Sequence, residues 1–137
     1  MSVATRHLII ATCGLGMLLL GGCAGKPVVP PKVPLYERLG GEETLVALSL
    51  QVSRDDRLAE MVNRRGERFF RMRLHDHLCI AASGPCEPVG TETFQREFAL
   101  GETEARTLRR VMAEELERLE VQSPEAQELL RVSGLPN

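Results

Sequence analysis

Aromatic side chains are scarce in this chain, and their scarcity limits what its core is made of. The 137 residues include one Tyr, four Phe and no Trp. A core of Leu, Val, Ala and Met suits helices better than sheets, because aromatic residues are among those that favour strands. With 43% hydrophobic and 26% charged residues, the composition is that of a globular chain and not of a fibre or a disordered tail. The chain is therefore predicted to be all-α.

Two long segments carry apolar side chains at helical spacing. In segment 66–82, Phe70, Leu74 and Leu78 follow one another at i, i+4 positions, which predicts a helix with one face toward the core. Segment 103–119 has a similar apolar face and is the clearest helix of the sequence. Both segments are therefore predicted to be long helices of the domain over 35–137.

Shorter helices are predicted around these two. Glu114 and Arg118 have the spacing of a supporting ion pair on one helix face. Asp55 or Asp56 is expected to cap a brief helix, and Ser123 to be the N-cap of the last one. The remaining predicted elements are a short turn over 35–39 and helices over 42–52, 55–62, 91–98 and 123–134.

The charges of the chain are nearly balanced. There are 17 basic and 19 acidic side chains, with a formal net charge of -2. This balance gives no field for binding phosphate backbones, so no nucleic-acid partner is expected. The acidic pairs Glu42-Glu43 and Glu114-Glu115 and the basic residues Arg68, Arg71 and Arg73 are expected to form solvated helix faces. The alternative for the arginines is contact with anionic headgroups or with acidic groups of a partner.

The first 22 residues have the pattern of a secretory signal peptide. Arg6 supplies a positive charge, and segment 8–20 has no charged side chain. This segment is too short to cross a bilayer as a helix, which takes about 20 residues. Leu20-Gly21-Gly22-Cys23 resembles a bacterial lipobox, which predicts that Cys23 is acylated and anchors the chain in a membrane. The alternative is a plain signal peptide followed by a chance Cys.

A proline-rich stretch follows this motif. Residues 24–34 hold four Pro and the only two Lys of the chain, which is typical of a semi-rigid spacer. The predicted organisation is a signal peptide over 1–22, a lipidated Cys and linker over 23–34, and a helical domain over 35–137. By resemblance to other bacterial lipoproteins, the lack of Asp at position 24 favours an outer-membrane anchor facing the periplasm.

Two of the four Cys remain in the expected helical domain. Cys79 and Cys86 are separated by six residues, among them Ser83-Gly84-Pro85, a turn signal that folds the chain back. An oxidising compartment favours a disulfide between them. The alternative is two free, half-buried thiols. Neither cysteine belongs to a Cys-x-x-Cys motif, so redox-relay and covalent-haem chemistry are not indicated.

Three blocks of the sequence resemble the truncated (two-over-two) globin family, in a form close to its group I. Residues 35–42, LYERLGGE, are similar to the family's opening (S/T)-L-Y-E-R-L-G-G. Residues 55–58, DDRL, resemble its A-D-P-R-L step, and residues 78–86, LCIAASGPC, resemble the L-C-x-A-x-G-G-P-C end of its distal helix. The similarity spans most of 35–130 and implies a two-over-two helical fold with haem, O₂ and NO as family ligands.

The resemblance fails at the haem ligands. The family's proximal His aligns with Glu97, where only the second Gly of the H-x-G-x-G pattern is kept, as Gly101. A carboxylate is a harder and weaker ligand for ferrous haem than an imidazole. The first long helix is also about one turn shorter than the family's. The positions that the resemblance assigns to the distal side of the haem pocket are all apolar, namely Phe70, Leu74 and Leu78.

Other groups are weak candidates for a haem or metal ligand. His75 and His77 point about 200° apart on a regular helix, so they cannot chelate one metal, although either is an alternative axial ligand after rearrangement. We expect both to be partly exposed helix residues beside Asp76. No metal site is assigned. The methionines are expected to be core fillers, namely Met61, Met72 and Met112.

Two functions follow from these observations. The favoured one is a membrane-anchored lipoprotein whose degenerate globin domain binds no haem, is not an enzyme and serves as a structural or interaction module for an envelope partner. The alternative is a truncated haemoglobin that binds haem and O₂ or NO through unusual axial ligation. Loss of the proximal His, the missing helical turn and the apolar distal face favour the first.

Overall fold

Every element that the structure describes is helical. The computed structural model describes residues 32–88 and 93–137 and has no strand among them, in agreement with the predicted all-α class. The predicted signal segment, Cys23, nearly all of the linker and Thr91 lie outside the described residues. The described elements are α1 (Leu35–Arg38), α2 (Glu42–Ser53), the 3-10 turn η1 (Asp56–Leu58), α3 (Ala59–Asn63), α4 (Glu67–Ala81), α5 (Phe94–Glu97), α6 (Glu102–Arg118) and α7 (Ser123–Val132).

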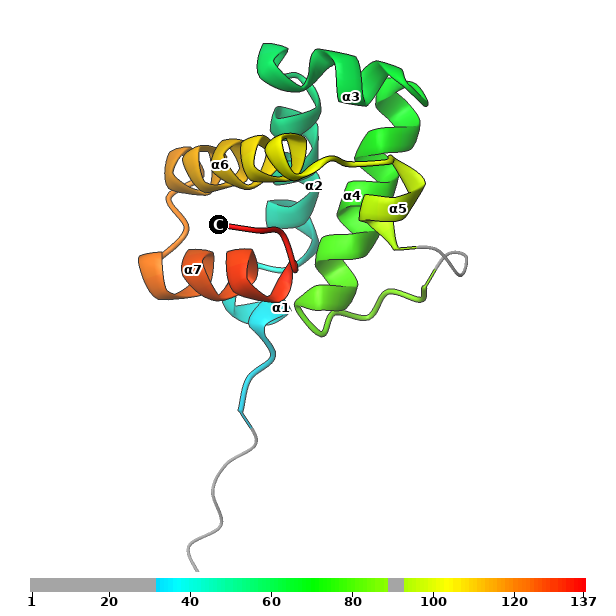
Figure 1. Cartoon of the computed structure of the whole chain (residues 1–137). Helices are drawn as coiled ribbons and strands as arrows, with labels where there is room; N and C mark the ends of the chain where they lie inside the picture. The colour runs from blue at the N-terminus through cyan, green and yellow to red at the C-terminus, as the bar shows by residue number, and fades with distance from the viewer. Residues whose placement is uncertain (1–31, 89–92) are drawn as a thin grey trace, which may run out of the picture. The chain divides into compact units, whose positions relative to one another are not determined.

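Two helix pairs make up most of the fold. α2 packs along α4, α6 packs against α7, and α6 also contacts α2. Figure 1 shows α6 and α7 running across the direction of α2 and α4. α2 and α4 are antiparallel, because Glu42 at the start of α2 contacts His75 in the second half of α4, whereas Ser53 at the end of α2 contacts Glu67 at the start of α4.

The core lies where the apolar faces of these helices meet. Each long helix contributes residues at i, i+3 or i+4 spacing, so that one stripe of each is removed from water. The stripe predicted on α4 is buried as expected. Fully or almost fully buried side chains of the core include Leu45, Leu48, Val52, Leu58, Phe70, Leu74, Leu78, Phe98, Leu108, Met112, Leu116 and Leu129.

The short helix α1 closes one end of the fold. The Tyr36 N–H donates to the Ala82 carbonyl at 2.9 Å, which ties α1 to the end of α4. Arg38 donates to Glu128 at 2.7 Å, which ties α1 to α7. The chain then reverses at Gly40-Gly41 with φ angles of +102° and +71°, a conformation in which only glycine is free of strain. This reversal lets α2 start beside α1.

Polar contacts of α6 differ from the prediction. Glu114 accepts a hydrogen bond from Arg57 Nη1 at 3.1 Å, while Arg118 pairs with Glu115 at 2.6 Å, so the predicted pair of Glu114 and Arg118 is wrong. The reason is tertiary: α6 packs against η1, whose Arg57 is held by Asp55. Glu115 is 4% exposed, so the expected solvated position of this carboxylate is also wrong.

Helix caps follow the predictions in part. Asp55 is the cap before η1, and its Oδ1 accepts the Arg57 N–H at 2.9 Å. In α7, Ser123 is the first helical residue and Gln122 precedes it as the N-cap, so the predicted Ser123 cap is wrong. The Ser123 hydroxyl instead accepts a hydrogen bond from Gln127 within the helix. Gly134 follows the helix at a φ of +71°, as expected of a C-terminal stop.

Candidate functional site

A largely buried ion pair joins α4 to α5. Arg73 Nε donates to Glu97 Oε2 at 2.6 Å, and the two side chains are 9% and 14% exposed. Asp76 is a second acidic partner, 3.7 Å from Arg73 Nη1. The predicted solvated position of Arg73 is therefore wrong. Its place on α4, one turn after the buried Phe70, directs it toward α5 and not toward water.

The apolar residues assigned to the haem pocket by resemblance contact other side chains of the core. The Phe70 ring lies 5.6 Å from that of Phe94 and 5.2 Å from that of Phe98, and the last two rings are 4.8 Å apart. These are the separations of aromatic rings in direct contact. Leu74 and Leu78, which continue the same stripe, have no exposed surface.

The contacts of Glu97 differ from those that an axial haem ligand would need. An axial ligand needs a free lone pair and a haem-sized space beside it. The Glu97 carboxylate is instead engaged by Arg73, and the aromatic rings of α4 and α5 are in contact with one another. The residue at the expected proximal position thus serves as the partner of a buried cation.

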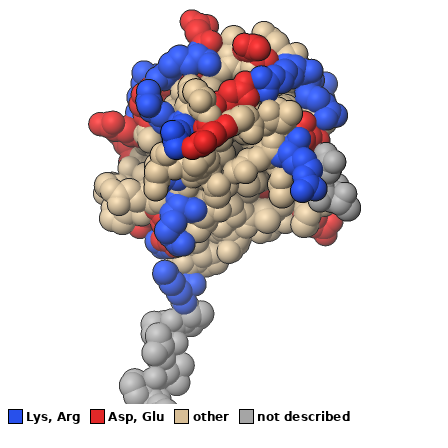
Figure 2. All heavy atoms as spheres, viewed as in Figure 1, with Lys and Arg blue, Asp and Glu red and all other residues tan. Residues whose placement is uncertain are grey.

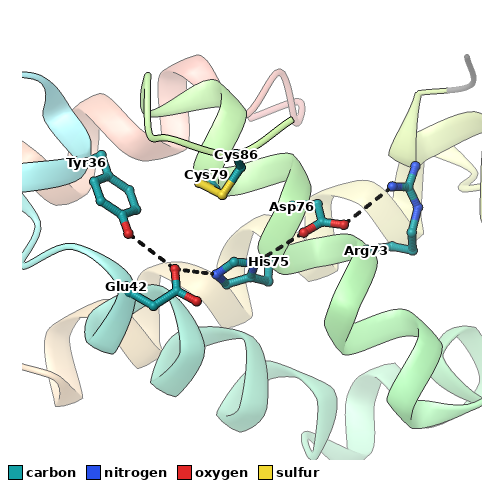
Figure 3. Close-up of a disulfide and its surroundings, with 7 residues drawn as sticks. All are labelled: Tyr36, Glu42, Arg73, His75, Asp76, Cys79 and Cys86. Carbon is teal, nitrogen blue, oxygen red and sulfur yellow. Dashed lines mark hydrogen bonds and ion pairs between the residues drawn. A yellow bond between two sulfur atoms is a disulfide. The ribbon is translucent and has the colours of Figure 1, made fainter. Parts of the chain in front are cut away.

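His75 belongs to a chain of polar contacts between α1, α2 and α4, drawn in Figure 3. Its Nε2 lies 3.0 Å from Glu42 Oε2 and its Nδ1 lies 3.3 Å from Asp76 Oδ1. The Tyr36 hydroxyl donates to the same Glu42 oxygen at 3.2 Å, and burial together with this hydrogen bond raises the pKa of Tyr36. Asp76 extends the chain to Arg73. His75 is thus turned toward α2. Glu42 has the solvent-exposed position that was predicted, with 59% of its side chain exposed, and it contacts Tyr36 and His75 from there.

His77 faces a different part of the fold. Its ring stacks on Phe94 with centroids 5.5 Å apart, and its Nε2 lies 2.8 Å from the Ser133 carbonyl oxygen after α7. Burial lowers the pKa of His77 and outweighs the opposite effect of this hydrogen bond. The two histidines therefore contact separate elements, α2 for His75 and α5 with the end of α7 for His77, and the structure does not bring them together.

A disulfide links Cys79 on α4 to Cys86 in the segment after it. The two Cα atoms are 6.0 Å apart, so of the two alternatives for this pair the structure contains the bridge (Figure 3). Gly84 lies between them in close contact with its surroundings. A Cβ at this position would be 2.6 Å from Cys79 Sγ and 2.6 Å from a ring carbon of Tyr36. The bridge therefore fixes a turn that packs against α1.

A groove of about 260 Å³ lies along the seam between α2 and α4. Glu42 and His75 line it at one end, where they contact each other. The other lining residues are Val46 and Ser49 of α2 and Arg68, Arg71 and Met72 of α4. A second hollow of about 390 Å³ lies where α6 is followed by α7, with Ala113, Glu117, Val121, Ala126 and Leu130 among its lining residues.

Surface charges are mixed on the face shown in Figure 2, where basic and acidic side chains lie next to one another. Within residues 32–88 and 93–137, no three His, Cys, Asp or Glu side chains are grouped so as to hold a metal ion. The helices of these same residues include none with the length and apolar character of a membrane span. Of the methionines expected in the core, Met61 and Met112 are buried, but Met72 is 47% exposed in the groove.

Comparison with known proteins adds no family assignment. No protein-family model matches the chain, and a search of curated proteins returns no similar sequence.

Sequence reasoning missed the residues that make the α2–α4 groove distinctive. Ser49 reads as an ordinary polar position of a helix, and Val46 as one of several apolar residues in its segment. The signal that points to them is their spacing: Glu42, Val46 and Ser49 follow at i, i+4 and i+7 and so share one face of α2. That this face is left partly uncovered depends on where α4 lies.

Proposed function

We propose that the chain is a lipid-anchored lipoprotein of the bacterial envelope, whose region 35–137 is a truncated-globin-like module that carries no haem and acts by binding another protein. The anchor is the acylated Cys23, which two or more acyl chains would hold stably in the outer membrane. The spacer over 24–34 has up to about 3.1 Å of reach per residue, which keeps the module within some tens of Å of the lipid.

A globin-like fold is supported by the order and pairing of the helices. A two-over-two arrangement consists of two helix pairs that cross each other. α2 with α4 and α6 with α7 have this pairing, and the second pair crosses the first (Figure 1). The opening motif also has a structural part, because Tyr36 contacts Glu42 and Gly40-Gly41 form the turn between them.

The contact between Arg73 and Glu97 carries the haem-free part of the proposal. A guanidinium that is 9% exposed needs an anionic partner, since an unpaired buried charge costs several kcal/mol. Coordination of iron by Glu97 would withdraw this partner. His75 and His77 would each have to leave two described contacts to reach an iron atom from the other side. An interaction role is favoured over an enzymatic one because Glu97 is engaged by Arg73 and His75 by Glu42 and Asp76, and neither of these described groups lies beside a nucleophile that it contacts.

A haemin titration tests the haem-free function. Ferric haemin is added to the purified protein, and the Soret band is recorded in the ferric, ferrous and CO-bound states. We expect no saturable band. A saturable one-to-one band would overturn the proposal, and its loss in His75→Ala or His77→Ala would identify the ligand of the alternative haemoglobin function.

A further inference from the structure

Two arginines of the α2–α4 groove lack an acidic partner among the described residues. Arg68 is exposed and Arg71 is half-buried, both line the groove, and neither forms an ion pair there. By contrast, Arg73 on the same helix and Arg57 and Arg64 nearby in the sequence all pair with carboxylates. A guanidinium offers its donors in a fork that matches a carboxylate, so the unpaired Arg68 and Arg71 give this part of the groove an affinity for such an anion.

A buried hydroxyl in the groove also lacks a partner. Ser49 lines the groove and has no exposed surface, and its Oγ has no hydrogen-bond partner among the described residues. A buried polar atom without a partner is uncommon in native proteins and costs about 1–3 kcal/mol. A ligand oxygen or N–H that reaches Ser49 would remove this cost, which is an observation independent of the arginines.

The middle of the groove is apolar. Val46 and Met72 are 48% and 47% exposed and line the groove from its two sides. They are two of the few large apolar side chains that the described surface exposes to this extent. An aliphatic group placed over them would remove this surface from water.

The two ends of the groove differ in charge. Because α2 and α4 are antiparallel, Glu42 and His75 lie at one end, Val46 and Met72 come next, and Arg68 lies toward the other end. One end therefore accepts hydrogen bonds at the carboxylate of Glu42, which is 59% exposed, and the other attracts an anion. The ligand that fits is one with an anionic end, an aliphatic group beside it and amide N–H groups behind it.

We propose that the groove between α2 and α4 binds the C-terminal carboxylate of a peptide whose last residue is aliphatic. The carboxylate lies between Arg68 and Arg71, the aliphatic side chain covers Val46 and Met72, and backbone N–H groups face Glu42. A volume of about 260 Å³ limits the bound segment to a few residues. A medium-chain fatty acid shares the carboxylate and the aliphatic part, but it has no N–H for Glu42. This inference rests on the proposed function as a protein-binding module and names the chemistry of its partner.

Calorimetric titration of the purified chain with N-acetyl-Gly-Ala-Leu tests the site, beside the same peptide with a C-terminal amide and beside octanoate. We expect the free carboxylate to bind, and the amide to bind at least about tenfold more weakly because it loses the charge-assisted hydrogen bonds to arginine. Arg71→Gln and Arg68→Gln should each weaken binding of the carboxylate peptide by about tenfold or more. Arg110→Gln is the matched control, since Arg110 is exposed on α6 and has no ion pair among the described residues. It should leave the binding unchanged.

Ser49→Ala separates binding from stability. It should weaken peptide binding by about 2- to 10-fold, the effect of one hydrogen bond, without lowering the thermal midpoint of the free protein. The assignment would be overturned if the carboxylate peptide does not bind, or if its amide binds equally well. It would also be overturned if octanoate binds as tightly as the peptide, or if Arg110→Gln weakens binding as much as the groove variants do. Any of these outcomes would leave the result of the haemin titration unchanged. Conversely, a Soret band in a protein that still binds the peptide would overturn the haem-free function but not the peptide site.

Discussion

Nε of Arg73 lies 2.6 Å from Oε2 of Glu97, and this contact connects α4 to α5 in a part of the fold that is mostly shielded from water. Each charge makes the burial of the other tolerable, because a charge left alone at such a place costs several kcal/mol. Glu97 is also the residue that the globin resemblance puts at the proximal haem position. The same carboxylate therefore has a structural role where the family has a ligand.

Removing the carboxylate should destabilise the protein through the cation that is left behind. Glu97→Leu is expected to lower the free energy of unfolding by about 3 kcal/mol, the usual cost of breaking a buried pair. Adding Arg73→Met in the same chain should recover most of this loss, because the unpaired charge is gone. Urea unfolding followed by circular dichroism measures both effects.

An exposed pair provides the control for this comparison. Arg106 and Glu102 form an i, i+4 pair on α6 with side chains 53% and 71% exposed. Arg106→Ala should change the free energy of unfolding by no more than about 0.5 kcal/mol. If Glu97→Leu has an effect as small as this, the buried pair does not hold α5 in place.

Loss of the disulfide should lower stability by a predictable amount. Cys79 and Cys86 are seven positions apart, and in the chain-entropy model a loop of this size contributes about 2.5 kcal/mol. The variant with Cys79→Ala and Cys86→Ala should unfold at a correspondingly lower urea concentration. A reductant should shift the wild type toward the variant and leave the variant unchanged, whereas a wild type that is insensitive to reductant would show that the bridge does not contribute.

Gly84 should tolerate no side chain. A Cβ there would meet Cys79 Sγ and the Tyr36 ring at 2.6 Å, and neither moves freely, because one is in a disulfide and the other is packed against the turn. Gly84→Ala is expected to cost about 1–3 kcal/mol, the range for overpacking. Gly101→Ser is the matched control: a Cβ there has nothing within 4 Å, and serine is a good residue at this helix start. Equal thermal midpoints for the two variants would contradict the close contact at Gly84.

His77 should make stability depend on pH. Burial lowers its pKa in the folded protein, so below the unfolded pKa of about 6.5 the unfolded chain binds a proton that the folded one does not. The free energy of unfolding is therefore expected to fall as the pH is lowered from 7.5 to 5.0, and to fall less in His77→Phe, which keeps a ring against Phe94. Carboxylates whose pKa is lowered by arginines, such as Glu104, also make the free energy of unfolding depend on pH, but at lower pH than His77 does. Urea titrations at both pH values measure the difference, and parallel curves for wild type and variant would contradict it.

Local sequence patterns predicted which segments are helical, but not which polar groups they bring together. The i, i+4 stripe of Phe70, Leu74 and Leu78 is buried as predicted, because periodicity fixes which face of a helix is apolar. Glu114 satisfies the same local rule with Arg118, yet it bonds to Arg57, since the partner offered by another element lies closer in space.

In the candidate sites too, local patterns were predictable from the sequence, whereas contacts between distant elements were not. The spacing of Cys79 and Cys86, together with the oxidising compartment that the predicted signal peptide implies, was enough to raise the bridge as one of two alternatives. Burial of Arg73 was not predictable from an arginine-rich segment, because it requires knowing that Glu97 lies opposite. The groove depends on the relative placement of α2 and α4, which no motif records.

The central claim is that Glu97 is the partner of Arg73 and not a haem ligand. It is tested most directly by the guanidinium resonance of Arg73 in a ¹H–¹⁵N spectrum, which is recorded before and after addition of one equivalent of haemin. An Nε–H held by Glu97 should give a slowly exchanging signal that is lost in Glu97→Leu, which has no acceptor at this position. We predict that haemin leaves the signal and its exchange rate unchanged in the wild type. Loss of the signal together with the appearance of a Soret band would show that Glu97 gives up Arg73 when haem binds, and would contradict the haem-free account.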